Sequence, residues 1–348
     1  MVKNVTVFGA GLMGAGIAQV AAQNGFKVVL ADVTEKALEN GFSIIQKSLG
    51  RVAKKKFAGR EGEIEGWTGE VLSNIGTATD AGEAVSTSDL VVEAIVENLN
   101  TKRSLFGFLD GKADPRCIFA SNTSSFSIGD IAGTCREERL TRFAGFHFFN
   151  PVPAMRLVEV IKTRHTSQET FDTLVAVAKK MEKVPVSAKD TPGFITGRLL
   201  IPYMLEAIRM AERGDASPQD IDTAMELGAG YPMGPFKLLD LVGLDTTTFI
   251  SNGWREKAER GEIPKELVAK IPMLQKLVDE GKLGRKTGRG FYDRYLAHEA
   301  DEVRAGSTPL KDDTRAPRGE KGGACANDMR AAPRMRIQFE HPTSPILA

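Results

Sequence analysis

The chain has 348 residues with 46 basic and 45 acidic side chains, so its net charge of +1 gives no reason to expect a nucleic acid or a membrane surface as partner. The length exceeds that at which a single hydrophobic core usually stops growing, and two domains are therefore expected. Apolar residues at 42% and charged residues at 26% are typical of a globular protein, and no apolar run is long enough to span a membrane.

The N-terminal stretch has the order strand, glycine turn and helix. Val5–Phe8 is an apolar strand, Ala15–Gln23 is a helical run, and between them stand Gly9, Ala10, Gly11, Leu12, Met13 and Gly14. Glycine permits the tight turn at 9, lets backbone N–H groups approach a pyrophosphate at 11, and lets the helix pack against the strand at 14. Anions are favoured at the helix start. The pattern predicts a dinucleotide site.

A second strand, Lys27–Ala31, ends at Asp32, about 20 residues beyond the glycine turn. A carboxylate at this place accepts a hydrogen bond from the ribose 2′-OH of NAD. The following residues, 33–35, offer no arginine for the 2′-phosphate of NADP. We therefore expect NAD as the cofactor.

Strands and helices then alternate. We expect a long helix at 35–57, a loop at 59–69, where four glycines fall among charges, a strand from 75, a helix at 80–85, a strand at 90–95, a helix at 101–109 and a strand at 117–120. The basic triplet Lys54–Lys56 at the end of the long helix is typical of a solvated face near the negative end of a helix dipole. The alternation predicts an α/β domain with a mostly parallel sheet.

Small polar residues, Ser121–Ser125, follow the strand at 117–120. The carboxyl ends of parallel strands are where a doubly wound sheet holds its ligand. A cluster of serine and threonine that caps a helix is an equally good interpretation.

A histidine in the next strand, 143–149, stands among four phenylalanines. Alternation places Phe146 and Phe148 on one face and His147 and Phe149 on the other. Partial desolvation disfavours the charged form of an imidazole, which suits a base, although a structural role is the commoner one for a lone strand histidine.

An acid alternates with aliphatic residues in the following strand-like segment, 157–161. If this segment pairs antiparallel with the preceding strand, Glu159 meets His147. The alternative is a salt bridge from Glu159 to a lysine or an arginine.

The pattern changes near Asp190. A helix at 168–183 and a strand at 184–187 complete the alternating region, and only helical periodicity follows, at 194–213, 218–227, 235–242, 245–260 and 265–280. We expect an α/β domain at 1–189 and an all-helical domain at 190–296. Residues 297–348 contain few apolar residues and are expected to be a disordered tail.

Five segments together carry a resemblance: the glycine turn at 9–14, residues 121–125, Phe146–Pro153, Lys189–Ile195 and Gly230–Phe236. In this order they resemble the NAD-dependent L-3-hydroxyacyl-CoA dehydrogenases, over about residues 1–295, and within that family the short-chain enzyme of mitochondrial fatty-acid oxidation and the bacterial 3-hydroxybutyryl-CoA dehydrogenases. The resemblance implies a Rossmann-like NAD-binding domain followed by a helical domain for dimerisation and substrate binding. It implies the interconversion of (S)-3-hydroxyacyl-CoA and 3-oxoacyl-CoA.

The resemblance also assigns roles to single residues. It implies His147 as the catalytic base, Glu159 as its partner, and Ser124 and Asn150 as contacts to nicotinamide and substrate. Further NAD contacts are implied at Glu97, Lys102 and Lys286, and coenzyme A contacts at Ser48, Lys55 and Ser124. The basic triplet then becomes a phosphate contact rather than a solvated face.

One residue departs from the family pattern. The family usually has asparagine in the run that corresponds to 194–200, where this chain has Gly197. Loss of an amide hydrogen bond predicts a slower enzyme or a changed substrate preference, and the alternative function is a NAD-binding homologue with weakened or lost catalysis.

Partners and location follow from the same observations. We expect an acyl-CoA as substrate, a homodimer as implied by the family, and neither nucleic acid nor membrane as partner. Three cysteines without a CxxC pair, Cys117, Cys135 and Cys325, indicate a reducing compartment, and the four histidines lack metal-site spacing, so no metal is expected. The first strand begins by Val5, which leaves no room for a leader, so we expect a protein that stays in the cytosol or one whose leader has been removed. The resemblance implies the mitochondrial matrix in a eukaryote and otherwise the cytoplasm.

Overall fold

The fold is described from a computed structural model, which describes residues 2–293. Its first part is built on an eight-stranded sheet with the spatial order β3-β2-β1-β4-β5-β6-β7-β8. All neighbouring strands are parallel except β6 and β7, which are antiparallel. The expected mostly parallel sheet is confirmed. The strands are β1 (Asn4–Phe8), β2 (Lys27–Ala31), β3 (Ile75–Ala78), β4 (Leu90–Glu93), β5 (Ile118–Ser121), β6 (Phe143–Phe148), β7 (Leu157–Lys162) and β8 (Val184–Lys189).

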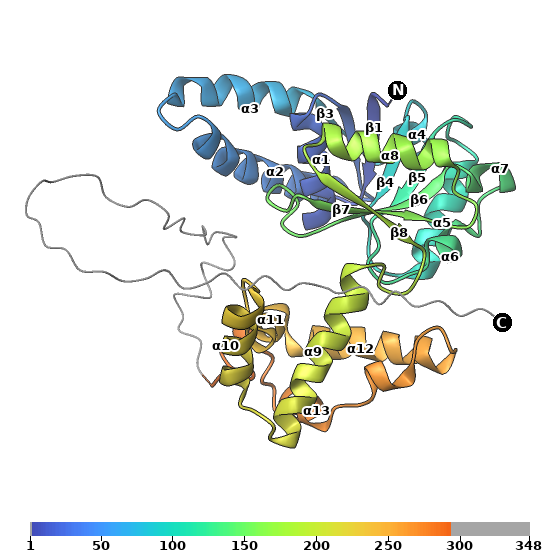
Figure 1. The fold of residues 1–348 in the computed structure, drawn as a ribbon. Helices are drawn as coiled ribbons and strands as arrows, with labels where there is room; N and C mark the ends of the chain where they lie inside the picture. The colour runs from blue at the N-terminus through green and yellow to red at the C-terminus, as the bar shows by residue number, and fades with distance from the viewer. Residues whose placement is uncertain (1, 294–348) are drawn as a thin grey trace, which may run out of the picture. The chain divides into compact units, whose positions relative to one another are not determined.

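Helices cover both faces of this sheet (Figure 1). One face packs against α1 (Leu12–Gln23), α2 (Glu35–Lys56) and α8 (Gln168–Lys180), and the other against α4 (Ala81–Val85), α5 (Leu99–Asp110) and α6 (Ile128–Ala132). The short helix α7 (Glu137–Leu140) precedes β6. Because both faces are covered, a central strand such as β4 is buried along its whole length. The chain reverses its winding between β1 and β4, and a doubly wound sheet binds its ligand at such a point.

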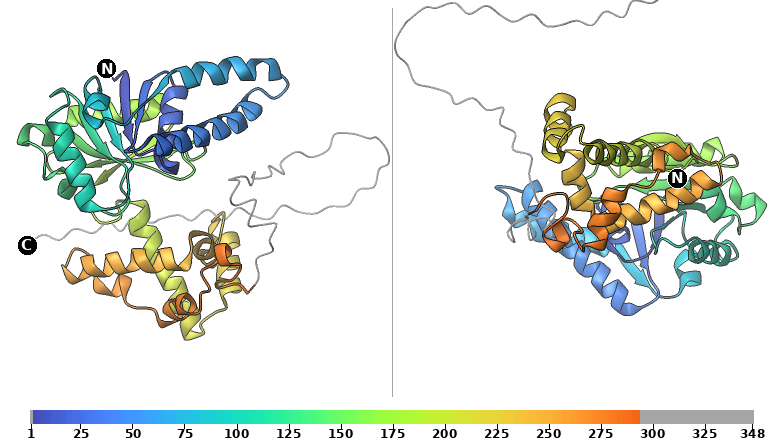
Figure 2. Two further views of the ribbon diagram at one scale, coloured as in Figure 1. Left: turned by 180° about the vertical axis from the view of Figure 1, so that it is seen from behind. Right: turned by 90° about the horizontal axis from the view of Figure 1, so that it is seen from below.

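The prediction of a loop at 59–69 is wrong. The structure has a 3-10 turn, η1 (Glu61–Glu63), followed by helix α3 (Ile64–Ser73), which runs beside α2 in both Figures 1 and 2. A Cβ added at Gly62, Gly66 or Gly69 meets nothing within 4 Å, so these glycines face open space and do not break the helix. Trp67 packs against Phe57 with ring centroids 5.7 Å apart. Tertiary packing therefore outweighs the low helix propensity of glycine.

Past β8 the described residues form helices and turns, apart from an isolated bridge between Gly284 and Arg289. Four of the five helices predicted here match closely, and the prediction of a single helix at 265–280 is wrong. This segment is two pieces, η2 (Lys265–Val268) and α13, which starts at Pro272 because proline removes a backbone donor and tolerates only the first turn. The other elements are α9 (Thr196–Arg213), α10 (Pro218–Ala229), α11 (Pro235–Val242), α12 (Leu244–Glu259), α13 (Pro272–Asp279) and η3 (Arg285–Thr287).

A separate apolar core joins these helices, with Phe236, Leu239, Leu244 and Ile208 fully buried. The tail predicted at 297–348 lies outside the described residues. Within residues 2–293, no helix is both long and apolar enough to cross a bilayer. The same residues contain no cluster of three or more His, Cys, Asp or Glu side chains arranged to hold a metal ion.

Candidate active site

The glycine turn after β1 has the geometry that close approach to a ligand requires. Gly9 has φ +103°, and a Cβ there would lie 2.5 Å from the carbonyl oxygen of Ala94. A Cβ at Gly14 would collide with the carbonyl oxygen of Gly9. At Gly11 a Cβ would meet nothing within 4 Å, so this side of the turn is open. Neighbouring backbone atoms therefore exclude a side chain at Gly9 and Gly14. The open space beside Gly11 is what a bound pyrophosphate needs in order to approach the backbone.

Asp32, at the end of β2, lies beside this turn. Its Oδ2 accepts a hydrogen bond of 2.7 Å from the backbone N–H of Ala10, and its Oδ1 accepts one of 2.7 Å from Val33. The backbone therefore holds the carboxylate next to residues 9–14. Leu12 is 58% exposed at the start of α1. The residues at this turn fit a dinucleotide, with a carboxylate positioned for a ribose hydroxyl.

A buried polar network extends from the end of β4. The Nζ atom of Lys102 lies 2.6 Å from Glu93 Oε1 and 3.1 Å from Glu97 Oε2. Ser121 donates to Glu93 Oε2 at 2.6 Å, and Thr123 donates to Glu97 Oε1 at 2.5 Å. Lys102 is only 1% exposed, so its ammonium is committed to these two carboxylates. The network fixes Glu97, and with it the carboxyl end of β4.

The polar stretch at 121–125 has a structural part and an exposed part. Ser121 and Thr123 are buried in the network, whereas Ser124 is exposed, and its hydroxyl oxygen lies 3.5 Å from that of Ser125. The cap of α6 is Ser127, outside the stretch, whose hydroxyl accepts from the N–H of Asp130. The capping interpretation thus applies to the next residues along, and Ser124 is left facing solvent.

His147 and Glu159 face each other across the antiparallel pair β6 and β7, where the register places them opposite. The Nδ1 atom of His147 lies 2.8 Å from Glu159 Oε2. The alternative of a salt bridge from Glu159 to lysine or arginine is not found among its described contacts. The His147 ring lies 4.5 Å from that of Phe149 and 5.8 Å from that of Phe194. Phe146 and Phe148 pack on the opposite face of the sheet, as the alternation predicts.

Glu159 is fully buried and is held by the first turn of α9. Its Oε1 accepts hydrogen bonds from the N–H of Thr196 at 2.8 Å, from the Thr196 hydroxyl at 3.0 Å and from the N–H of Ile195 at 3.2 Å. Burial alone raises the pKa of this carboxyl, but the hydrogen bonds from His147 and Thr196 outweigh it, so the pKa lies below its ordinary value. Glu159 is therefore an ionised acceptor for His147 at neutral pH.

Asn150 is exposed and directly follows the histidine strand, before a cis bond to Pro151. The neighbouring turn is fixed by Lys183, whose Nζ donates to the carbonyl oxygens of Val152 at 2.5 Å and Met155 at 2.9 Å. Burial lowers the pKa of Lys183 to about 8. The buried Lys183 side chain therefore fixes the turn that follows Asn150 through these two hydrogen bonds.

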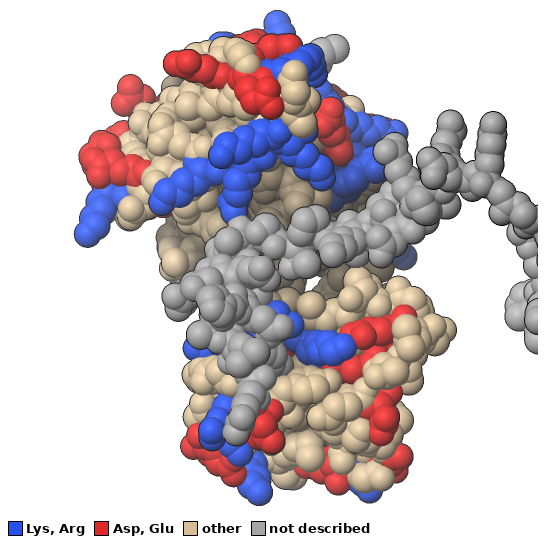
Figure 3. Space-filling view, turned by 90° about the vertical axis from the view of Figure 1, so that its left-hand side faces the viewer, with Lys and Arg blue, Asp and Glu red and all other residues tan. Residues whose placement is uncertain are grey.

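The three remaining implied residues lie in other places. Ser48 is half-buried and Lys55 is exposed, both on α2, and Figure 3 shows lysine and arginine side chains gathered in a band over the side of the sheet region that α2 and α3 form. Lys286, in η3, pairs with Asp245 of α12 at 2.5 Å. Among the contacts of the described residues, none joins these three to His147, so they lie apart from the pair of His147 and Glu159.

A cleft of about 900 Å³ adjoins the carboxyl end of the sheet. Glu97 and Ser125 line one side, and Phe249, Trp254 and Lys257 of α12 line the other. The Lys257 ammonium donates to the carbonyl oxygen of Ser125, next to Ser124. Burial lowers the pKa of Lys257. The helical part of the chain therefore contributes a wall to the space beside Ser125, the neighbour of Ser124.

Sequence reasoning missed three of the residues that build this site: Glu93, Thr196 and Lys257. Glu93 had a signal, an acid that ends an otherwise apolar strand, and a buried acid needs a partner. Thr196 and Lys257 act through contacts with residues 37 and 132 positions away in the chain, for which local spacing gives no signal.

Comparison with known proteins agrees with this geometry. Residues 4–191 match the family described as "3-hydroxyacyl-CoA dehydrogenase, NAD binding domain", and residues 193–294 match "3-hydroxyacyl-CoA dehydrogenase, C-terminal domain". The chain belongs to the 3-hydroxyacyl-CoA dehydrogenase family. It is thus an NAD-dependent 3-hydroxyacyl-CoA dehydrogenase, and the expected function, cofactor and family are confirmed.

Relatives span nearly all of the described part. The human protein named "Hydroxyacyl-coenzyme A dehydrogenase, mitochondrial" is 59% identical over 293 residues, which are 84% of this chain and 91% of that protein. A "Probable 3-hydroxybutyryl-CoA dehydrogenase" of Bacillus subtilis is 43% identical over 84% of this chain and 97% of its own. The crystal structure of (S)-3-hydroxybutyryl-CoA dehydrogenase from Ralstonia eutropha matches with a TM-score of 0.77 and 36% identity, over 85% of this chain and all of that one.

Proposed function

We propose that this dehydrogenase oxidises (S)-3-hydroxyacyl-CoA to 3-oxoacyl-CoA and catalyses the reverse reaction, with His147 as the base. The observation that carries this proposal is the 2.8 Å contact between His147 Nδ1 and the buried, ionised Glu159. A carboxylate on one ring nitrogen fixes the tautomer in which the other nitrogen, Nε2, is free to accept a proton.

Proton transfer follows from this pair. When bound, NAD supplies the hydride acceptor. Neutral His147 takes the proton of the C3 hydroxyl at Nε2 as the C–H bond at C3 breaks, and Glu159 stabilises the imidazolium that results. In the reverse direction the imidazolium returns the proton to the C3 oxygen. Phe149 and Phe194, which pack around the His147 ring, exclude water from it.

Binding roles are proposed for the surrounding residues. Gly9, Ala10, Gly11, Leu12, Met13, Gly14 and Asp32 hold the adenosine and pyrophosphate of NAD, and Glu97, Lys102 and Lys286 are further contacts. The Lys102 ammonium pairs with Glu93 and Glu97, so we place its contact with NAD next to Glu97. Ser124 and Asn150, both exposed, orient the substrate oxygen and the nicotinamide amide. Ser48 and Lys55 bind coenzyme A.

The organisation of the chain is also proposed. We place the domain boundary near Asp190, between the end of β8 and the start of α9. We propose a homodimer formed through the helical domain, because Leu199, Leu227 and Val242 of α9, α10 and α11 are 69%, 84% and 40% exposed. Because the human relative bears the name "mitochondrial", we place a eukaryotic source of this chain in the mitochondrial matrix and a bacterial one in the cytoplasm.

The test is a steady-state assay of NADH oxidation with acetoacetyl-CoA, on the native chain and on His147→Gln. A general base contributes about 10²- to 10⁴-fold, and a loss of that size in kcat is expected. A second candidate, a NAD-binding homologue with weakened catalysis, is favoured by Gly197 alone. Tight NADH binding without turnover by the native chain supports it and contradicts the leading proposal.

A further inference from the structure

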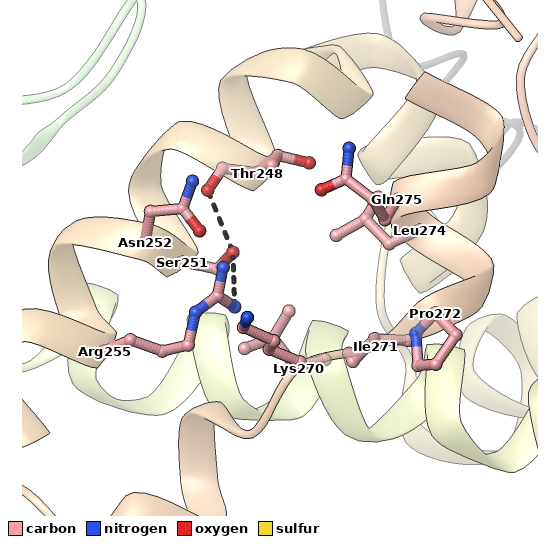
Figure 4. A pocket seen from close by; sticks show the side chains of 10 residues that line it. Thr248, Ser251, Asn252, Arg255, Lys270, Ile271, Pro272, Leu274 and Gln275 are labelled. Atoms are coloured by element: carbon pink, nitrogen blue, oxygen red, sulfur yellow. Dashed lines mark hydrogen bonds between the residues drawn. The ribbon is translucent and has the colours of Figure 1, made fainter. Parts of the chain in front are cut away.

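A second pocket lies wholly within the helical part of the chain, between α9, α12 and the start of α13 (Figure 4). Its volume is about 340 Å³, near the lower end of the range for small-molecule sites. None of the residues given a role in the dehydrogenase reaction lines it. Its polar side chains are Thr248, Ser251, Asn252, Arg255, Lys270 and Gln275.

The lining contains two cations and no acid. The guanidinium of Arg255 donates to the Ser251 hydroxyl at 3.5 Å, and that hydroxyl donates to the Thr248 carbonyl oxygen at 3.0 Å. Within residues 2–293, neither Arg255 nor Lys270 forms an ion pair. A partly desolvated cation without a counter-charge costs free energy, and a bound anion would remove that cost.

Burial lowers the pKa of the Arg255 guanidinium, and no nearby charge offsets this. Because the lining has two cations and no acid, the electrostatic environment of the pocket is positive. Arginine also offers two parallel N–H groups to a carboxylate, a geometry that lysine cannot give.

The far side of the pocket has a different character. Figure 4 shows the cationic groups of Arg255 and Lys270 close to each other on one side of the opening, with Thr248 and Gln275 on the other. The Gln275 amide N–H donates to Asp279 at 2.7 Å, which leaves its Oε1 atom as an acceptor. The Oε1 atom of Gln275 can accept a hydrogen bond from a hydroxyl group of a ligand.

Apolar side chains make up the floor. Leu205, Ile271 and Leu274 line the pocket and are at most 5% exposed, because they belong to the core of the helical region. An inorganic anion would leave this floor in contact with water. A ligand with a short aliphatic chain would cover it.

We propose that this pocket binds a short-chain hydroxycarboxylate. Its carboxylate pairs with Arg255 and Lys270, its chain lies over the apolar floor, and its hydroxyl donates to Gln275. This site goes beyond the proposed dehydrogenase function and does not depend on it, since it shares no residue with the NAD or acyl-CoA contacts.

The test is a titration of the full chain with (S)-3-hydroxybutyrate, followed by saturation-transfer NMR. NADH and 3-hydroxybutyryl-CoA are present at saturation, because they cannot react with each other and they block the other sites. Binding is expected to persist. Arg255→Gln should weaken it about tenfold or more, which corresponds to one lost charged contact. Lys270 is exposed, so Lys270→Gln leaves the core intact. This variant should weaken binding of hydroxybutyrate about threefold to tenfold.

The matched control is Arg156→Gln. Arg156 is an exposed arginine that forms no ion pair within the described residues, but it lies in the sheet region, and its replacement should leave binding unchanged. Displacement of hydroxybutyrate by NADH or acyl-CoA would overturn the proposal, as would equal binding in well-folded Arg255→Gln and Lys270→Gln. Butyrate or inorganic phosphate that binds as tightly as hydroxybutyrate would also overturn it, because the hydroxyl or the chain would then not be recognised.

Discussion

Thr196 donates two hydrogen bonds to one oxygen of Glu159, from its backbone N–H at 2.8 Å and from its hydroxyl at 3.0 Å. The other oxygen of Glu159 is thereby turned toward His147, 2.8 Å away. Thr196 is the first residue of α9, so the helix that follows the sheet orients the proposed catalytic pair, His147 and Glu159. The free N–H groups at a helix start stabilise a carboxylate there.

Glu159→Gln keeps the shape of this arrangement and removes the charge. We expect kcat to fall about 10²- to 10⁴-fold, because the imidazolium of His147 loses its counter-charge and its tautomer is no longer fixed. The KM for acetoacetyl-CoA should change little, since Glu159 is fully buried and does not reach substrate. Steady-state kinetics of NADH oxidation measure both. A Glu159→Gln enzyme with native kcat would contradict the proposed role of the pair.

Thr196→Val removes only the hydroxyl that holds Glu159. A hydrogen bond to a charged group contributes about 1.5–3 kcal/mol, so we expect a fall in kcat of about ten- to a hundredfold with KM retained. Thr196→Ser keeps the hydroxyl and is the matched control, with activity near the native value. If serine and valine variants are equally impaired, the effect comes from packing at the start of α9 and not from the hydrogen bond.

Lys183 predicts a pH dependence of stability. Its pKa is about 8 in the folded chain against an ordinary value of 10.5, so between these pH values the unfolded chain binds more protons at this site. The free energy of unfolding contributed by Lys183 therefore rises from pH 8 to 10.5 and is lost as the pH falls through 8.

Thermal unfolding measures this effect. The Tm of the native chain minus that of Lys183→Met should grow between pH 8 and pH 10. Lys179→Met is the control, because Lys179 is an exposed lysine nearby in the last turn of α8, and its difference should stay constant. A constant difference for Lys183→Met as well would rule out the titration of Lys183 in this window.

The two described cysteines should be inert in the native chain. Burial raises the pKa of Cys117 and Cys135 to about 12, so at pH 8 only about one thiol in ten thousand is ionised. In a Cys325→Ser background we expect a thiol-specific disulfide reagent to label less than one equivalent within minutes. In guanidinium chloride the same protein should react with two equivalents of the reagent, one for each thiol. Rapid labelling without denaturant would show that either thiol is reached by solvent.

Local patterns in the sequence predict the sheet well. The glycine turn, Asp32 and the alternation around His147 depend on neighbours a few residues apart, and their positions in the structure follow from backbone geometry. The antiparallel return from β6 to β7 is a non-local step that the sequence leaves open, beside the alternative of a salt bridge from Glu159 to lysine or arginine, and the structure forms it. It brings His147 opposite Glu159.

Contacts between distant segments could not be predicted in this way. The helix at 64–73 forms although it contains Gly66 and Gly69, since Trp67 and Val71 pack against other elements. Thr196 and Lys257 join parts of the chain that no local spacing relates. The roles of Ser48, Lys55 and Lys286 came from family resemblance, and the structure alone gives their positions but not their ligands.

Gly197 offers the test of how far this chain departs from its family. It is the second residue of α9, directly after Thr196, and a Cβ placed there meets only the Ile201 side chain, at 4.0 Å. Asparagine can therefore be introduced without a clash. If its amide restores a hydrogen bond in the transition state, kcat should rise about ten- to a hundredfold.

Gly197→Ala separates this effect from backbone stiffening, because alanine favours the helix by up to about 1 kcal/mol without adding an amide. Alanine should raise Tm and leave kcat near the native value, whereas asparagine should raise kcat. An equal gain in both variants would assign the effect to helix stability. No gain in kcat with asparagine would show that Gly197 does not limit the reaction. If the native chain is inert and Gly197→Asn makes it active, the native chain is a NAD-binding homologue that has lost catalysis at this one position.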